Sequence, residues 1–560
     1  MYKARIFSSE VSRYRILAAV IFTAIFLFTI NIVGGETFGD TGYEMKTGQY
    51  ILEHHVIPTT DIFSFSAHGA PWIAHYWLAG VIFYLINAAV GFTGLMVVVS
   101  SLAVFTYWIV LKTAWLKSKT RLLPLIILAP FSFLTYELWV PRPQIFSYLL
   151  TALLIFLLEK WRISKNDRLL FILPLLFILW ANVHSGVVLG LLILCIYVGS
   201  IVIQNGFTNR KTIIFLATAL VCFLAALINP NGINTLLYFK IIGSSASALH
   251  VAEWDSLLLY LNRWQAEVFF TEMLAAMVIV LLLCTRSKNQ MKGFFSVPCL
   301  MVLLASALPV VSIRHVGLFP ILAFPFFAVA LEQLIEPLLW RREIGRQLTV
   351  FVAGAGAVVV AAGLLLLPSK QIIDANFLPV GGARFIQTQH VEGPMFNDPA
   401  FGGYLIWSLW PEQKVFIDGR NEVYSGKPTQ DFLAIMEWKS GWENLINKEY
   451  KFNYFILWYR GTLAQHTVGL TESLVAQENF KLVYWDDAAI ILLRNIPENK
   501  KLIDAFGYEV ISPFRAPLSL TPDQLEKAKQ EIKKAIALNP DSDTLKSYAH
   551  QIEEAAVKRQ

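Results

Sequence analysis

Apolar residues are concentrated in runs that follow one another along the first two thirds of the chain. A helix needs about 20 apolar residues to cross the roughly 30 Å hydrocarbon core of a bilayer. Such runs, some of them short, lie at 14–33, 94–113, 121–138, 144–159, 168–183, 186–204, 212–228, 267–284, 294–312, 316–335 and 347–367. The pattern therefore predicts a polytopic α-helical membrane protein with about eleven transmembrane helices.

Residues 74–91 form one more apolar run, and the basic residues decide its interpretation. If the N-terminus is cytoplasmic and this run does not cross, every basic cluster falls in a cytoplasmic loop, as the positive-inside rule requires. The clusters lie at 3–15, 112–121, 160–168, 210–211, 286–292 and 341–346. We interpret 74–91 as an amphipathic or re-entrant segment on the outer face, with Trp72, Tyr76 and Trp77 at the membrane interface. The first run then acts as a signal anchor, and the chain beyond about residue 370 is extracytoplasmic.

Composition supports a membrane protein and excludes disordered and coiled-coil classes. Of 560 residues, 56% are apolar and 15% are charged, and mean hydropathy is +0.54; soluble proteins average roughly 25% charged residues. Basic cytoplasmic loops explain the net charge of +6 better than nucleic-acid binding does. The C-terminal third contains no cysteine, so no disulfide framework or zinc motif is expected there.

Three domains follow from these patterns. Residues 1–368 form the transmembrane domain, in which 34–93 is a large outer loop with juxtamembrane helices. Residues 369–500 alternate between strand and helix patterns, which is typical of a small α/β domain. Its expected strands are 393–397, 414–418, 452–459 and a pair in 480–494, and an expected helix covers 402–410. Residues 501–560 form a linker and a helical hairpin that resembles one tetratricopeptide unit and could dock a protein partner.

Polar residues collect at the predicted outer ends of the helices, where such residues usually mark function. They are Asp40 and His75 in the first loop, Glu137 and Arg142 after the third span, Asn182 and His184 after the fifth, Glu253 in a later loop, and Arg314 with His315 after the ninth. One outer-face site could collect all of these side chains.

Asp40 has the sharpest functional interpretation. It stands in the sequence G-D-T-G-Y, where Gly39 and Gly42 allow a tight turn that would aim the carboxylate at a cavity. A carboxylate there could be a general base that deprotonates an acceptor hydroxyl or amine. The alternative is that Asp40 is the N-cap of a helix that begins near Tyr43.

Arg142 and Arg314 could bind a phosphate group, because guanidinium binds phosphate in a bidentate fashion. The alternatives are interfacial snorkelling for both and, for Arg142 between two prolines, a plain helix break. A metal could be ligated, with Asp40 or Glu137, by His54, His55, His75 and His184, but their spacing matches no zinc signature, so hydrogen bonding is favoured. Asp418-Gly419-Arg420 is interpreted as a structural turn with a salt bridge.

Several motifs resemble the GT-C superfamily of integral-membrane glycosyltransferases, which includes protein O-mannosyltransferases and lipid A aminoarabinose transferases. A first span is followed by a large outer loop with the early Asp40. The loop continues as G-x-Y-I-L-x-x-H-x-I-P-x-x-D-x-F-S from residue 48 and W-x-x-H-Y-W from residue 72. Further motifs are R-P-Q at 142–144, N-x-H-S-G at 182–186, N-P-N-G at 229–232, E-W-D at 253–255, G-G-Y-L-I-W at 402–407 and V-F-I-D-G-R at 415–420.

This resemblance implies transfer of a sugar from a polyprenyl-phosphate donor on the outer leaflet of a bacterial cytoplasmic membrane to a lipid, glycan or protein acceptor, with inversion at the anomeric carbon. Asp40 is the implied general base, Glu137 the second acidic residue, and Arg314 the ligand of the lipid phosphate. Arg142, His315, His75, Asn182, His184 and Glu253 are the other expected substrate contacts. Asp40 is followed by Thr41 and so lacks the Asp-Glu pair of the mannosyltransferases, which leaves the second acid open. No cofactor is expected, although oligosaccharyltransferases use a divalent metal.

Two other classes compete with this interpretation. An O-antigen ligase or polymerase is also polytopic, but its large functional loop usually lies late in the chain, whereas here the first loop is the largest. A non-enzymatic transporter or envelope scaffold is the second alternative. Transporters usually carry inverted repeats and mid-span charges, and the sequence shows neither.

Overall fold

The computed structural model describes residues 2–31, 36–133, 135, 138–246, 252–285, 290–339, 375–460 and 464–558. The chain divides into two compact units, which are described separately. Unit 1 comprises 1–32, 74–240 and 250–369, and unit 2 comprises 33–73, 241–249 and 370–560. The predicted span at 347–367 lies outside the described residues, so eleven crossings remain a prediction.

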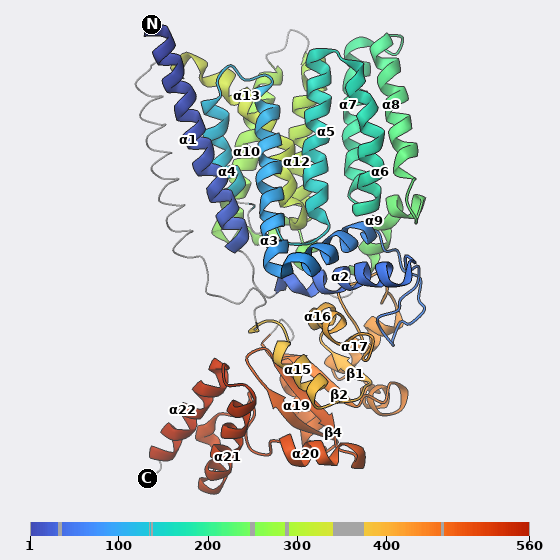
Figure 1. The fold of residues 1–560 in the computed structure, drawn as a ribbon, viewed down its shortest axis with the longest axis vertical. Helices are drawn as coiled ribbons and strands as arrows, with labels where there is room; N and C mark the ends of the chain where they lie inside the picture. The colour runs from blue at the N-terminus through green and yellow to red at the C-terminus, as the bar shows by residue number, and fades with distance from the viewer. Residues whose placement is uncertain are drawn as a thin grey trace. The chain divides into compact units, whose positions relative to one another are not determined.

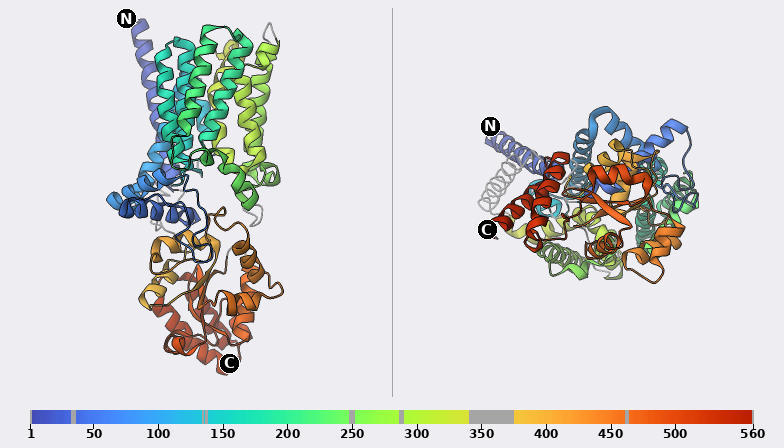
Figure 2. Two further views of the ribbon diagram at one scale, coloured as in Figure 1. Left: turned by 90° about the vertical axis from the view of Figure 1, so that its right-hand side faces the viewer. Right: turned by 90° about the horizontal axis from the view of Figure 1, so that it is seen from below.

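Unit 1 consists of helices that run side by side (Figures 1 and 2). The other ten predicted apolar runs all coincide with helices. These are α1 Tyr2–Asn31, α3 Trp77–Trp115, α4 Leu122–Phe133, α5 Gln144–Ser164, α6 Leu173–Val183, α7 Val187–Asn205, α8 Arg210–Ala226, α10 Trp264–Thr285, α12 Val297–Val311 and α13 Phe319–Leu339. The shorter α9 (Ile233–Ala246) and α11 (Gln290–Phe294) connect them. Among the described residues, five helices are long and apolar enough to cross a membrane, and three more apolar helices are shorter.

Helix α3 contains a sharp change of direction that bears on the run at 74–91. Gly91 has φ 70° and ψ 177°, which is not a helical conformation and is accessible mainly to glycine. The fourteen residues before it are too few to span a hydrocarbon core, whereas those after it form a long apolar helix. The kink thus separates 74–91 from the following span, as the positive-inside argument requires.

Unit 2 contains a four-stranded sheet with the order β1-β2-β4-β3. Strands β1 (Met395–Asn397) and β2 (Tyr454–Trp458) are parallel, and β4 (Ala489–Arg494) pairs antiparallel with β2 and with β3 (Phe480–Trp485). Helices α15 Val380–Thr388, α16 Pro399–Leu409, α17 Lys427–Met436, α18 Trp442–Asn444, α19 Ala464–Ala476 and α20 Lys500–Phe506 accompany the sheet. The predicted strand at 414–418 is wrong, because Val415 makes only an isolated bridge with Ser64.

The C-terminal hairpin, α21 (Pro522–Leu538) and α22 (Asp543–Val557), is present as predicted, with a capping box at Thr521. It is bound to the turn between β3 and β4. The carboxylate of Asp487 accepts a hydrogen bond from the backbone N–H of Thr544 at 2.8 Å, and the Asn539 side chain donates to the Trp485 carbonyl at 3.2 Å. These hydrogen bonds attach the hairpin to the sheet of the same chain.

Helix α2 (Glu36–His54) packs against α16 at glycine positions. A Cβ atom on Gly403 would lie 1.6 Å from the carbonyl oxygen of Gly39, and one on Gly42 would lie 2.4 Å from that of Gly403. Gly39 and Gly42 both lie within helix α2, so the tight turn expected there is wrong. They serve backbone-to-backbone contact, which only residues without a Cβ allow.

Replacing Gly403 by alanine should destabilise the protein, because the added methyl group overlaps the backbone of α2. Overpacking of this kind costs about 1–3 kcal/mol or more. The measurement is the thermal unfolding midpoint in detergent. Gly199→Ala on α7 is the matched control, since a Cβ there would meet nothing within 4 Å. A Gly403→Ala protein as stable as the control would contradict the packing account.

Candidate active site

Three charged residues from separate elements of unit 1 form an ion-pair cluster. Arg142 precedes α5, Glu253 lies in the 3₁₀ helix η3 (Ala252–Trp254), and Arg314 lies in η5 (Ile313–Leu318). Nη1 of Arg142 donates to Oε1 of Glu253 at 2.8 Å, and Nη1 of Arg314 lies 3.9 Å from Oε2. The Ser312 hydroxyl donates to the Glu253 carbonyl at 2.7 Å, so η3 and η5 are joined directly. Glu253 thus connects both predicted phosphate ligands.

Arg314 has unused hydrogen-bonding capacity. Its guanidinium carbon lies 5.3 Å from the Trp254 ring centroid, and its side chain is one-third exposed. Within the described part of the chain, no acceptor lies within hydrogen-bond distance of the Arg314 guanidinium. Stacking therefore positions the group while leaving its N–H fork available, which is the arrangement that suits bidentate phosphate binding.

The charge of Glu253 is set by its neighbours. Arg142 lowers the pKa of Glu253 to about 2, with Arg314 acting in the same direction and burial in the opposite one. Glu253 is therefore a carboxylate at neutral pH. It neutralises one of the two arginines, so the cluster keeps a net positive charge near Arg314.

Two histidines lie within the field of Arg314. The ring centroids of His75 and His184 are 5.6 Å apart, and the His75 ring also lies 4.0 Å from that of Tyr238. Burial, followed by Arg314, lowers the pKa of His184 to about 3. Burial also lowers the pKa of His75 well below its ordinary value, with His184 and Arg314 acting in the same direction. Both rings are therefore neutral at neutral pH.

Helix α5 links the histidines to Arg314. The hydroxyl of Ser147 lies 2.7 Å from Nδ1 of His184. The next residue, Tyr148, contacts η5, since a Cβ on Gly317 would lie 2.7 Å from its hydroxyl oxygen. One turn of α5 therefore contacts the segment that carries His184 and the segment that carries Arg314.

Two of the predicted substrate contacts have structural partners. The Asn182 amide donates to the carbonyls of Ile178 and Ile228, both at 2.8 Å, and its oxygen accepts from Trp77. Nδ1 of His315 lies 3.3 Å from the Leu308 carbonyl. Glu137 lies outside the described residues.

Asp40 belongs to unit 2 and lies inside α2. The N-cap alternative is therefore wrong, because the helix begins at Glu36 rather than near Tyr43. The carboxylate lies over Gly419, where a Cβ atom would be 2.4 Å from Oδ1 of Asp40. Asp40 is half-buried.

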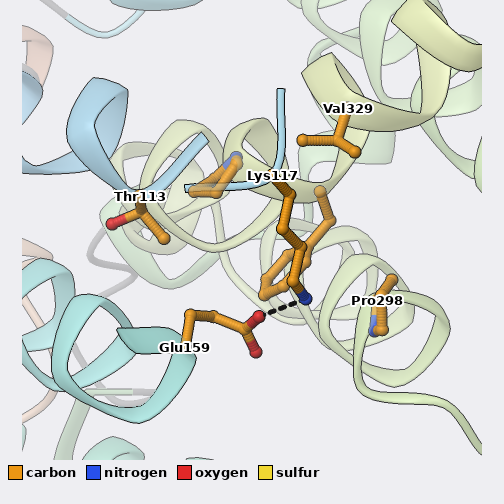
Figure 3. Close-up of a pocket in the computed structure, with 7 residues that line it drawn as sticks. Thr113, Lys117, Glu159, Pro298 and Val329 are labelled. Atoms are coloured by element: carbon orange, nitrogen blue, oxygen red, sulfur yellow. Dashed lines mark hydrogen bonds and ion pairs between the residues drawn. The ribbon is translucent and has the colours of Figure 1, made fainter. Parts of the chain in front are cut away.

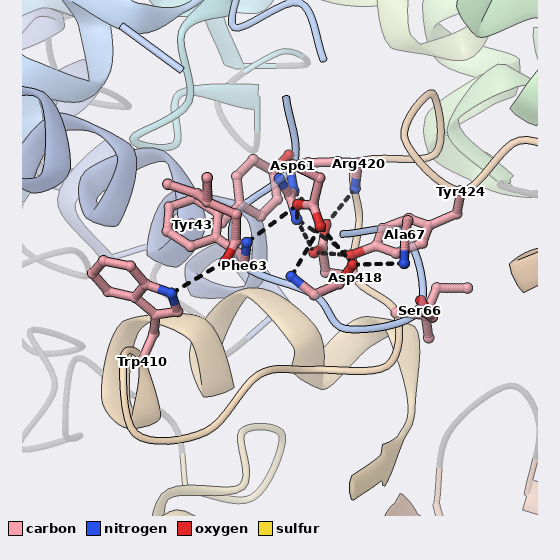
Figure 4. Close-up of polar contacts among 12 residues, drawn as sticks. Tyr43, Asp61, Phe63, Ser66, Ala67, Trp410, Asp418, Arg420 and Tyr424 are labelled. Atoms are coloured by element: carbon pink, nitrogen blue, oxygen red, sulfur yellow. Dashed lines mark hydrogen bonds and ion pairs between the residues drawn. The ribbon is translucent and has the colours of Figure 1, made fainter. Parts of the chain in front are cut away.

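The Asp418–Arg420 turn forms the most buried charge cluster of unit 2 (Figure 4). Nη2 of Arg420 lies 2.7 Å from Oδ1 of Asp61 and 2.6 Å from Oδ2 of Asp418, and all three side chains are fully buried. The guanidinium also lies 4.6 Å from the Trp72 ring centroid. The predicted structural salt bridge is confirmed, and Trp72 is 2% exposed in this cluster rather than an exposed interfacial residue.

A second polar cluster lies at the other end of α5. The Glu159 carboxylate accepts hydrogen bonds from Lys117, from Arg162 at 2.7 Å and from Tyr197 at 2.9 Å. A small cavity of about 40 Å³ adjoins the pair formed by Lys117 and Glu159 (Figure 3). The ammonium group of Lys117 lines this cavity and pairs with Glu159, whose other oxygen pairs with Arg162.

The described residues contain no cluster of three or more His, Cys, Asp or Glu side chains with metal-binding geometry. Sequence reasoning missed Ser147 and Trp180, which hold His184. Both lie within apolar runs, where a serine or a tryptophan carries no signal of its own. Only the proximity created by packing α5 against α6 shows their role.

Comparison with known proteins identifies solved structures with a similar fold. No protein-family model and no curated protein matches the sequence. Among solved structures, one match is the archaeal oligosaccharyltransferase AglB from Archaeoglobus fulgidus in complex with an inhibitory peptide and a dolichol-phosphate. It has a TM-score of 0.58 and 10% identity, over 97% of this chain and 86% of that chain. A crystal structure of the Archaeoglobus fulgidus oligosaccharyltransferase tethered to an acceptor peptide that contains the NVT sequon matches with a TM-score of 0.52 and 11% identity, over 86% of this chain and 74% of that chain.

At such low identity the likeness shows the fold alone. The matched structures are GT-C glycosyltransferases, so the chain has a GT-C-like fold, as its motifs predict.

Replacing Asp418 by asparagine should strongly destabilise the protein, because it removes one of the two carboxylates that neutralise the buried Arg420. Breaking a buried ion pair lowers the free energy of unfolding by about 3–5 kcal/mol. Because Asp61 still pairs with Arg420, we expect a loss near about 3 kcal/mol. Thermal unfolding measures it. Asp504→Asn removes one partner of an exposed pair with Lys500 and should cost under about 1 kcal/mol. Equal effects of the two substitutions would refute the account.

Stability should fall as the pH decreases from about 6.5 towards 3. In the unfolded chain His184 has an ordinary pKa of about 6.5 and is protonated below that pH. In the folded protein its pKa is about 3, so between these two values the unfolded state binds one more proton than the folded state. Above pH 6.5 this group contributes no pH dependence. His184→Asn should make the slope of unfolding midpoint against pH shallower, with His75 retaining part of it. Substitution of the exposed His54 is the control, and an unchanged slope in His184→Asn would rule out this source.

Proposed function

We propose that the protein is a glycosyltransferase that moves a sugar from a polyprenyl-phosphate donor to an acceptor. The observation that carries the proposal is the GT-C-like fold combined with the half-buried guanidinium of Arg314, which has no hydrogen-bond acceptor among the described residues. One of the similar structures is a complex with a dolichol-phosphate, which is a polyprenyl phosphate like the lipid part of the proposed donor. The proposed setting is a bacterial cytoplasmic membrane, with the N-terminus inside and unit 2 outside.

The proposed reaction is an inverting displacement. The acceptor oxygen attacks the anomeric carbon while Asp40 takes the proton of the acceptor hydroxyl. The bond between the anomeric carbon and the phosphate oxygen breaks, and polyprenyl phosphate leaves with the electron pair. Arg314 stabilises the charge that develops on the departing phosphate, and Arg142 holds Glu253 beside it.

Glu137 remains the proposed second acid, and His315, Asn182 and His75 remain proposed substrate contacts. We propose transfer without a metal, as in the mannosyltransferases that the sequence resembles, although Asp40 lacks their Asp-Glu pair. Treatment with EDTA, followed by added Mn²⁺ or Mg²⁺, tests this assignment. Loss and recovery of transfer would contradict it.

Transfer should be lost in Asp40→Asn and strongly reduced in Arg314→Ala. General-base catalysis typically contributes 10²–10⁴-fold, so we expect Asp40→Asn to lower kcat by at least about 100-fold with little change in stability. The measurement is transfer of radiolabelled sugar from synthetic polyprenyl-phosphate sugars by protein in lipid nanodiscs.

Glu53→Gln is the matched control for Asp40→Asn, because Glu53 is an exposed carboxylate on the same helix. Full transfer by Asp40→Asn would refute its role as the base. Absence of transfer by stable wild-type protein with every donor would favour the ligase or scaffold alternatives.

A further inference from the structure

The contacts of His184 determine which of its two nitrogens carries the proton. The backbone N–H of Gly186 donates to Nδ1 at 3.1 Å, and an N–H group is only ever a donor. Nδ1 therefore presents a lone pair. Trp180 Nε1–H donates to the Ser147 oxygen at 2.7 Å, so the Ser147 hydroxyl points its own hydrogen at Nδ1. With Nδ1 an acceptor in a neutral ring, the proton is on Nε2.

Glycine at position 186 is needed for this arrangement. A Cβ atom there would lie 2.4 Å from the Ser147 oxygen and 2.7 Å from Nδ1 of His184. Gly186 thus allows the backbone to approach the imidazole closely enough to donate to it. Two donors on one nitrogen hold the orientation of the ring as well as its tautomer.

The Nε2–H group of His184 is a positioned donor without an acceptor among the described residues. A second unsatisfied group lies beside it. His75 is 8% exposed, and its buried Nδ1 has no hydrogen-bond partner in the described part of the chain. Buried polar groups are usually hydrogen-bonded, so the buried Nδ1 of His75 beside half-buried His184 indicates a place that a ligand or water completes.

The nearby charge identifies the kind of ligand. Arg314 acts electrostatically on both histidines and likewise has no acceptor within the described residues. The Tyr148–Gly317 contact places η5 on the turn of α5 that holds His184. A cation and a neutral donor within electrostatic range of each other match an anion with several oxygens, and phosphate is such an anion.

We propose that His184 binds an oxygen of the donor phosphate through Nε2–H as a neutral hydrogen-bond donor, held in that tautomer by Ser147 and Gly186. This inference rests on the proposed function and names a further binding residue for it. The role differs from that of a general acid, because the proton stays on His184 throughout. A neutral donor orients the phosphate, while Arg314 supplies the charge.

Two substitutions separate the two nitrogens of His184. In His184→Gln the side-chain amide N–H₂ takes the place of Nε2–H, so the donor is kept. In His184→Asn the shorter side chain offers its oxygen in the place of Nδ1, so the contacts with Ser147 and Gly186 are kept and the donor is lost. The pair therefore tests donation itself rather than removal of the ring.

The experiment measures binding of undecaprenyl phosphate, without any sugar, to full-length protein in nanodiscs. His184→Asn should bind it at least about tenfold more weakly than wild type, which is the loss expected for one hydrogen bond to a charged group. His184→Gln should stay within about threefold of wild type. Equal affinity of all three proteins, or equal loss in both variants, would overturn the inference. Inorganic phosphate added as competitor shows whether the site selects the lipid or any phosphate.

A second measurement does not depend on ligand binding. In ¹⁵N-histidine-labelled protein at pH 7, the His184 signals, assigned by their absence from His184→Asn, should show a neutral ring protonated on Nε2. A ring protonated on Nδ1, or on both nitrogens, would overturn the inference. Ser147→Ala should broaden or shift these signals. Transfer without dependence on His184 would refute the inference alone, whereas His184-dependent phosphate binding without any transfer would refute only the proposed function.

Discussion

The buried charge of Arg420 is the constraint on which the arrangement of unit 2 depends. A guanidinium removed from water is stable only where carboxylates and aromatic faces replace its hydration. Asp418 comes from the same turn as Arg420, but Asp61 and Trp72 come from the segment between α2 and α3. Satisfying this one charge therefore requires the early segment to fold with the sheet. Once that segment is in place, the glycines of α2 and α16 bring the two backbones into contact.

The charge of Arg314 in unit 1 is compensated less completely than that of Arg420. Arg420 has its charge fully compensated, whereas Arg314 keeps a guanidinium without an acceptor among the described residues. The histidines near it are neutral because burial and the arginine both disfavour an additional positive charge. This contrast separates a charge that stabilises the fold from a charge that is available to a ligand. It also explains why the candidate site consists of one cation and neutral donors rather than of several cations.

Hydrophobic runs predicted the helices of unit 1 well, because lipid-facing and buried positions are both apolar and the runs are long. The hairpin of strands at 480–494 was also predictable, since both strands are buried and a turn separates them. The strand predicted at 414–418 is absent, because the backbone hydrogen bonds of this segment go to Phe63, to Phe65 and to the side chain of Asn397 rather than to a neighbouring strand. Gly39 and Gly42 looked like a turn because glycine allows both turns and close helix contacts. Only the partner helix distinguishes the two.

At the candidate site, the sequence singled out several residues that lie together but not the connections between them. Arg142, Glu253 and Arg314 were all singled out, and they do meet. The control of His184 by Ser147 was not foreseeable, because Ser147 lies at the start of α5 and meets Trp180 and His184, at the end of α6, only through the packing of the two helices. The order of synthesis adds a consequence for the Asp61–Arg420 pair, whose members are 359 positions apart. At about 5–20 residues per second, Asp61 waits roughly 20–70 s for its partner to be made. During that interval every helix from α3 to α13 is synthesised, so unit 1 is complete in sequence before unit 2 has the residues with which to close.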